Sequence, residues 1–129
     1  MNVGNQAPPD VLVVDDDAAV CDSIAEVLGL LGYRATGATD GAVALDLLRH
    51  WGQAAALPRL VLLDLVMPTT GWQFRAEQRQ DPALAAIPVV VMSGVYQAEA
   101  AARNLDAADH LAKPIDVERL VAIVRRFCG

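Results

Sequence analysis

Acidic, hydroxyl and basic side chains follow four separate apolar runs of this sequence. They are Asp15 and Asp16 after Val11-Leu12-Val13-Val14, Asp64 after Leu60-Val61-Leu62-Leu63, Ser93 after Ile87 to Met92, and Lys113 after His110-Leu111-Ala112. A short apolar run bounded by turn residues is typical of a strand buried on both faces of a parallel sheet. The carboxyl ends of such strands meet at one edge of the sheet, where ligands bind. We therefore expect these five side chains to lie together.

The chemistry of this group predicts a phosphoryl-transfer site. Three carboxylates at close range repel one another and raise one another's pKa, and a divalent cation removes that conflict. Ligands that are all oxygen suit a hard ion such as Mg²⁺. The Lys113 ammonium and the Ser93 hydroxyl are suitable donors to phosphoryl oxygens. A carboxylate nucleophile beside Mg²⁺ and two such donors predicts a site that forms an aspartyl phosphate.

The elements that must position these residues alternate along the chain. Strands are expected over 11–14, 33–38, from 60 to Asp64, 87–92 and 110–112, and helices over about 18–31, 41–51, 72–80, 98–105 and 117–127. Five strands alternating with five helices predict a parallel sheet with helices on both faces and right-handed crossovers. Asp17 is expected to cap the first helix and Gly32 to end it.

Length and composition exclude several classes of protein. The 129 residues fit one domain, which we expect over 10–129 after a flexible N-terminal tail over 1–9. A formal net charge of -6 argues against direct binding of nucleic acid. The sequence shows neither a bilayer-spanning apolar stretch nor a signal peptide. Cys21 and Cys128 lack metal-ligand spacing, so we expect two reduced thiols in a cytoplasmic protein.

Four motifs, in this order, resemble the receiver domain of two-component response regulators (CheY-like). They are Val13-Val14-Asp15-Asp16-Asp17, Leu62-Leu63-Asp64-Leu65-Val66-Met67-Pro68, Val91-Met92-Ser93-Gly94 and His110-Leu111-Ala112-Lys113-Pro114. The resemblance implies a three-layer, doubly wound (βα)5 flavodoxin-like fold, with a five-stranded parallel sheet of order 2-1-3-4-5. It also implies that Asp64 is the phosphoacceptor. Mg²⁺ would then be held by Asp15, Asp16, Asp64 and the backbone carbonyl of Val66.

The resemblance further implies how such a switch works. Ser93 and Lys113 would contact the phosphoryl group, and the Lys113-Pro114 peptide is a candidate cis bond. The phosphodonor would be a sensor histidine kinase or a histidine phosphotransfer protein. Phosphorylation would change the 98–127 surface, which would control partner binding and is a candidate dimer interface. Beyond Mg²⁺-dependent self-phosphorylation and autodephosphorylation, no enzymatic activity is expected.

Several residues depart from the family pattern. His110 stands where the family usually has Tyr or Phe, so we expect a switch that is sensitive to pH. Val66 and Val95 replace polar residues that orient the attacking water, which predicts slow autodephosphorylation. Thr69-Thr70-Gly71 replaces the common Met-Asp-Gly, and Asp106 stands where a Gly commonly follows the fourth helix.

Two alternatives stay open at this point. Asp15-x-Asp17 after an apolar strand also mimics the opening motif of haloacid-dehalogenase-type phosphatases, with Asp15 as nucleophile, although Asp64 would then have no role. The other alternative is a receiver-like module that binds partners without being phosphorylated. The sequence does not identify the downstream target or a fused output domain.

Overall fold

The computed structural model describes residues 8–54, 56–65, 70–94 and 98–129, apart from the side chains of Thr70 and Glu99. Its strands are β1 (Val11–Val14), β2 (Ala35–Ala38), β3 (Leu60–Asp64), β4 (Val89–Gly94) and β5 (Asp109–Lys113). Its helices are α1 (Ala18–Leu30), α2 (Gly41–Gln53), α3 (Thr70–Gln80), α4 (Ala98–Asn104) and α5 (Val117–Cys128). The predicted tail lies mostly outside the described residues.

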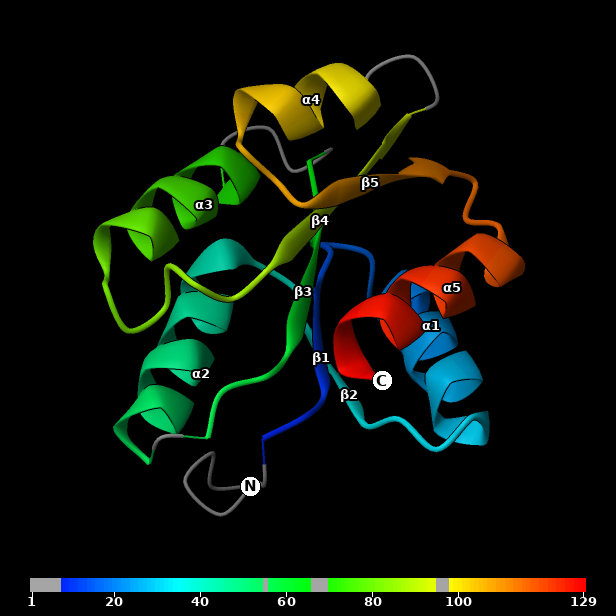
Figure 1. Cartoon of the computed structure of the whole chain (residues 1–129), viewed down its shortest axis with the longest axis horizontal. Coiled ribbons are helices and arrows are strands. Elements are labelled where there is room, and N and C mark those ends of the chain that lie inside the picture. Colours follow the sequence, from blue (N-terminus) through cyan, green and yellow to red (C-terminus); the bar gives the residue numbers. More distant parts are fainter. Residues whose placement is uncertain (1–7, 55, 66–69, 95–97) are drawn as a thin grey trace.

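The five strands form one parallel sheet in the predicted order β2-β1-β3-β4-β5. Helices α1 and α5 cover one face, and α2, α3 and α4 cover the other, as Figure 1 shows. Alternate residues of each inner strand enter opposite cores: Leu62 packs with the α1 and α5 side, and Leu63 with the other side. The apolar runs are therefore buried on both faces, which confirms the three-layer architecture.

The register of the strands decides which side chains share an edge. Val14 pairs with Leu63, so Asp15 follows β1 at the level where β3 ends in Asp64. Asp64 pairs with Met92, and Gly94 pairs with Lys113 on β5. The carboxyl ends of four strands therefore bring the predicted polar residues to one edge of the sheet.

Local hydrogen bonds determine where several elements begin and end. The fourth strand was expected over 87–92, but β4 begins at Val89 because the preceding residues form a turn. In that turn, Leu84 N–H donates to Asp81 O and Ile87 N–H donates to Leu84 O. Asp17 caps α1 as predicted, accepting from Ala19 N–H. Gly32 follows the end of α1 with φ of 91°.

Two unusual backbone conformations occur at positions discussed in the sequence analysis. The Lys113-Pro114 peptide is cis, as expected. Asp106 has φ of 53°, so an aspartate adopts the left-handed conformation at the position where glycine is common. Among the described residues, none of the helices has the length and apolar character needed to cross a membrane.

Candidate functional site

Three carboxylates converge at the carboxyl edge of the sheet. Asp15 follows β1 and is fully buried, Asp64 ends β3 and is 1% exposed, and Asp16 is exposed beside them. One carboxylate oxygen from each lies within 4.8 Å of the other two. The adjacent strand ends place Asp15 and Asp64, and the loop from β1 to α1 places Asp16.

Lys113 at the end of β5 completes this group. Its Nζ lies 2.8 Å from Asp15 Oδ2 and 3.3 Å from Asp64 Oδ1, and its side chain keeps a quarter of its exposure. Desolvation acts to lower the pKa of Lys113, but its hydrogen bond with Asp15 and the charge of Asp64 outweigh burial and raise that pKa. The ammonium therefore stays protonated and compensates two buried acids.

The loop that carries the first acids is held by hydrogen bonds of its own. Asp15 Oδ1 accepts from Asp17 N–H at 2.9 Å, and the Cys21 thiol donates to Asp15 O at 3.4 Å. A Cβ on Gly37 of β2 would lie 2.7 Å from Cys21 Cβ, so Gly37 allows the thiol to pack closely against the sheet. Sequence reasoning did not assign Cys21 this role; the available signal was its place on the buried face of α1.

These acids fit a hard divalent cation. Two carboxylates are buried and one is exposed, so an ion held between them would contact protein on one side and water on the other, as Mg²⁺ prefers. All the donors are oxygens, and neither thiol nor imidazole belongs to the described cluster. The proposed further ligand, Val66, lies outside the described residues.

Ser93 lies one position beyond the β4 residue that pairs with Asp64. It is buried, and its pairing partner on β5 is Ala112, next to Lys113. The strand register therefore places Ser93 next to the strand that ends in Asp64, as the apolar run before it predicted.

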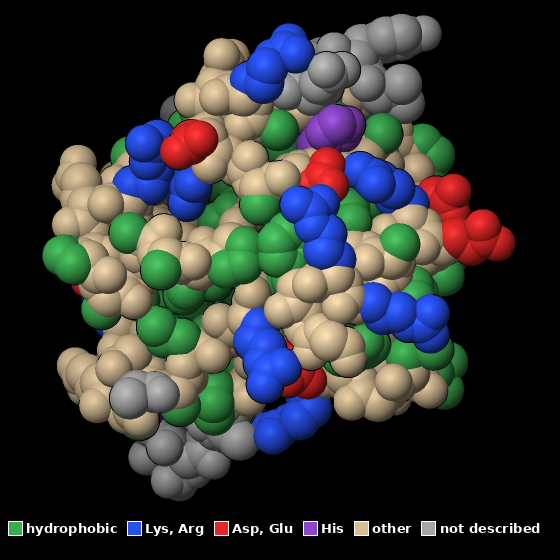
Figure 2. Space-filling model, viewed as in Figure 1, with side chains coloured by type: hydrophobic (Ala, Val, Ile, Leu, Met, Phe, Trp, Pro, Cys, Tyr) green, Lys and Arg blue, Asp and Glu red, His purple; other side chains and the backbone are tan. Residues whose placement is uncertain are grey.

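His110 lies apart from the acids, on the same strand as Lys113 but three residues earlier. Its Nδ1 is 3.6 Å from Asp109 Oδ1, and Asp109 also pairs with Arg119 and Arg126 at 3.0 Å each. On the face of the molecule shown in Figure 2, basic side chains outnumber acidic ones. The expected pH sensitivity of His110 stays a prediction.

Gly71 lets helix α3 begin close to the expected phosphoacceptor. A Cβ at this position would lie 2.9 Å from the backbone oxygen of Asp64 and 3.3 Å from a methyl carbon of Leu65. Contacts that short require the backbone to shift. Gly71 therefore allows the start of α3 to pack directly against the backbone of Asp64, a role that the sequence analysis did not predict.

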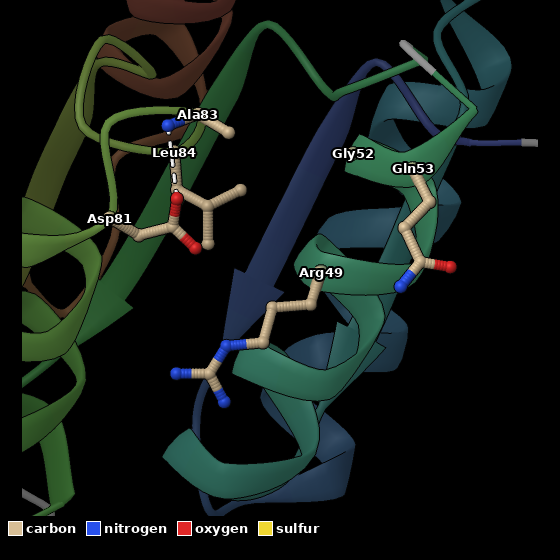
Figure 3. A pocket seen from close by; sticks show the side chains of 6 residues that line it. All are labelled: Arg49, Gly52, Gln53, Asp81, Ala83 and Leu84. Carbon is tan, nitrogen blue, oxygen red and sulfur yellow. Dashed lines mark hydrogen bonds between the residues drawn. The ribbon is translucent and has the colours of Figure 1, made fainter.

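A surface cavity of about 300 Å³ lies between the end of α2 and the turn before β4 (Figure 3). Arg49 and Gln53 line it from α2, and Asp81 faces them from the turn, where its carboxylate accepts from Ala83 N–H. It lies toward the opposite edge of the sheet from the acids. This cavity does not include the acidic group.

Known proteins share both this sequence pattern and this fold. The model of the response regulator receiver domain family matches residues 11–125. The chain is 34% identical over 128 residues to the two-component response regulator ORR11 of Oryza sativa subsp. indica, covering 95% of this chain and 84% of that protein.

Two further matches extend the comparison. The DNA-binding dual master transcriptional regulator RpaA of Synechocystis is 35% identical over 123 residues, which cover 91% of this chain and 48% of that protein. The chain thus spans about half the length of this relative. A crystal structure of a putative response regulator from Chloroflexus aurantiacus has a TM-score of 0.80 and 28% identity, covering 94% of this chain and 98% of that one. With its flavodoxin-like fold, its acidic pocket and its lysine, the chain belongs to the response regulator receiver family of two-component signalling.

Proposed function

We propose that this receiver is a phosphorylation-activated signalling switch that accepts a phosphoryl group on Asp64. The observation that carries the proposal is the placement of Asp64, buried at a strand end with Asp15 and Asp16 within 4.8 Å and the Lys113 ammonium at 3.3 Å. The donor is a phosphohistidine on a sensor kinase or a histidine phosphotransfer protein, which receivers take as partners. The switch itself spans 10–129 and acts in the cytoplasm.

The transfer uses the chain's own groups in distinct roles. A carboxylate oxygen of Asp64 attacks the phosphorus, an O–P bond forms, and the P–N bond of phosphohistidine breaks, with its electron pair leaving on the imidazole nitrogen. Asp15, Asp16 and Asp64, with the backbone carbonyl of Val66, would hold Mg²⁺. When bound there, the ion would neutralise charge between the acids and the phosphoryl oxygens.

After transfer, two donors turn toward the new phosphoryl oxygens. Lys113 already lies 3.3 Å from Asp64, so its ammonium exchanges Asp15 for a phosphoryl oxygen with little movement. The Ser93 hydroxyl donates from the neighbouring strand. These movements act on β4 and β5, which alters the 98–127 surface that governs binding of a partner or a second copy.

The experiment compares wild type, Asp64→Asn and Asp15→Asn. Each is incubated with Mg²⁺ and phosphoramidate and followed by intact mass. We expect one phosphoryl group on wild type, none on Asp64→Asn, and slower uptake by Asp15→Asn. Uptake by Asp64→Asn but not by Asp15→Asn would instead support the haloacid-dehalogenase-type phosphatase. No uptake by wild type would leave the non-phosphorylated binding module.

A further inference from the structure

The side chain of Arg75 crosses from α3 to the segment that follows α4. It is 7% exposed, and its guanidinium donates from Nε to Leu105 O at 2.9 Å and from Nη2 to Asp106 O at 2.8 Å. These carbonyls come directly after the end of α4, and α3 and α4 cover the same face of the sheet (Figure 1). A single buried cation therefore links two neighbouring helices.

Gln78 fixes this guanidinium in place from one turn further along α3. Its Oε1 accepts from Arg75 Nη1 at 2.8 Å, and its own Nε2 donates to Leu84 O and Ile87 O at 3.0 and 3.1 Å. Gln78 is completely buried. Arg75 is thus held to the turn that leads into β4, and its direction is fixed by a chain of hydrogen bonds.

The charge of Arg75 suits its position. A cation near the carboxyl end of a helix interacts favourably with the exposed carbonyls there. Burial and the neighbouring Arg79 lower the pKa of Arg75, whereas Asp106 raises it, and an arginine stays protonated under such shifts. Its fork reaches two adjacent carbonyls at once, which a single-point donor could not do.

Helix α4 packs against the sheet through small side chains. It has seven residues, and among those whose side chains the structure describes, the buried ones in the helix and at its end are three alanines and Leu105. Alanine contributes little apolar area and does not interlock with a neighbour, so this packing resists a sliding displacement weakly. The two hydrogen bonds from Arg75 therefore add a directional restraint that this packing alone does not provide.

This helix connects the two strands whose ends carry the switch residues. Strand β4 holds Ser93 and runs through 95–97 into α4, and the segment that Arg75 binds leads from α4 into β5 and Lys113. A movement that draws Ser93 toward Asp64 therefore pulls on the amino end of α4, while Arg75 restrains the carboxyl end. A movement of Lys113 acts on the segment that Arg75 itself holds.

We propose that Arg75 is a latch, a positioning residue that holds α4 in the resting arrangement and thereby opposes phosphorylation. The inference rests on the proposed function, because only phosphorylation of Asp64 gives the latch something to oppose. The structure holds the Arg75 contacts together with the Lys113–Asp15 contact, and the latch requires that the Arg75 contacts loosen when Lys113 turns to the phosphoryl group. By linkage, a contact made in the resting state alone disfavours phosphorylation, and its removal favours it.

The test compares wild type, Arg75→Met and Arg79→Met in two measurements. Arg79 lies on the same helix and pairs with the Asp106 carboxylate at 3.9 Å, so its removal takes away a cation but leaves both carbonyl bonds. The first measurement is amide hydrogen exchange of 98–108 in the unphosphorylated protein. The second is the rate of phosphorylation by phosphoramidate with Mg²⁺ in excess. Arg75→Lys, which keeps the charge and loses the fork, serves if Arg75→Met does not fold.

We expect Arg75→Met to exchange faster over 98–108 and to phosphorylate at least about threefold faster than wild type. Arg75→Lys changes in the same direction by less, and Arg79→Met behaves as wild type. If Arg75→Met exchanges faster but its phosphorylation rate is unchanged or lower, Arg75 only stabilises the end of α4, and the latch is overturned. Equal effects of both arginine substitutions would also overturn it. If wild type itself takes up no phosphoryl group, the proposed function fails and the latch fails with it.

Discussion

The ammonium of Lys113 donates a hydrogen bond of 2.8 Å to Asp15, a residue 98 positions earlier in the sequence. The contact joins the end of β5 to the three carboxylates and places a positive charge against a carboxylate that is fully buried. Burying an acid without such a partner is costly. Lys113 therefore balances part of the charge of the two buried acids.

Removing this cation should make the protein dependent on added metal. Lys113→Met leaves Asp15 and Asp64 buried without the ammonium, and we expect the free energy of unfolding to fall by up to roughly 3 kcal/mol. This is the low end of the range for a broken buried pair, because Lys113 keeps a quarter of its exposure. Mg²⁺ should restore more stability to Lys113→Met than to wild type, as measured by urea unfolding with and without the ion. An exposed-arginine control, Arg125→Met, should show neither effect. If Mg²⁺ does not reduce the loss of stability in Lys113→Met, Lys113 and Mg²⁺ do not neutralise the same acids.

Gly71 should not tolerate a side chain, whereas Gly29 should. The Cβ of Gly71→Ala would meet Asp64 O at 2.9 Å, so we expect a loss of about 1–3 kcal/mol and slower phosphorylation. Gly29 lies in α1 with open space around it, and Gly29→Ala should gain about 0.5–1 kcal/mol. Chemical denaturation of both variants checks the pair. Equal stability of the two would show that α3 does not approach Asp64 as closely as described.

Two buried thiols should make the fold sensitive to alkali. Burial raises the pKa of Cys21 and of Cys128 above the ordinary value of 9.0. The folded protein keeps both protons while the unfolded chain loses them, so stability is complete below about pH 8 and falls above about pH 9. The slope should approach about 1.4 kcal/mol per pH unit for each thiol. The Cys21→Ala/Cys128→Ala double variant should show a flatter dependence in urea unfolding between about pH 8 and about pH 10. If the free energy of unfolding depends on pH equally in wild type and in the double variant, the two thiols are not the source of the alkali sensitivity.

The phosphorylated form should decay slowly. Val66 and Val95, which stand where the family uses polar residues to orient water, lie outside the described residues, so this stays a prediction from the sequence. We expect Val66→Asn to shorten the phosphoryl lifetime by improving the position of the attacking water. Loss of the phosphoryl mass over time measures it. A wild-type lifetime of seconds, or no change in Val66→Asn, would count against the idea.

Much of the fold follows from the sequence because local and global signals agree. Apolar runs that end in acids or donors predicted the strands, and alternation with helices predicted the parallel sheet. Asp17 caps α1 because its side chain can accept an amide hydrogen bond, which a sequence pattern can indicate. The convergence of Asp15, Asp64 and Lys113 followed from the rule that parallel strands end at one edge.

What the sequence did not predict depends on contacts between distant segments. Arg75 and Gln78 would be assigned to the surface of α3 from residue type alone, yet the structure buries both, because the carbonyls that they bind come from segments up to 31 residues away. A signal was present, since α3 has few apolar residues to fill a buried face. Leu31 was expected inside the first helix, predicted over about 18–31, but the helix ends before it and Leu31 is 43% exposed.

The most direct test of the phosphoryl switch is to map the modified residue. The protein is treated with phosphoramidate, with Mg²⁺ or with a chelator, and the phosphorylated peptide is sequenced by mass spectrometry. The proposal predicts a single modification at Asp64 that forms with Mg²⁺ and is strongly reduced with the chelator. Modification at Asp15 instead, or equal labelling without the metal, would contradict it.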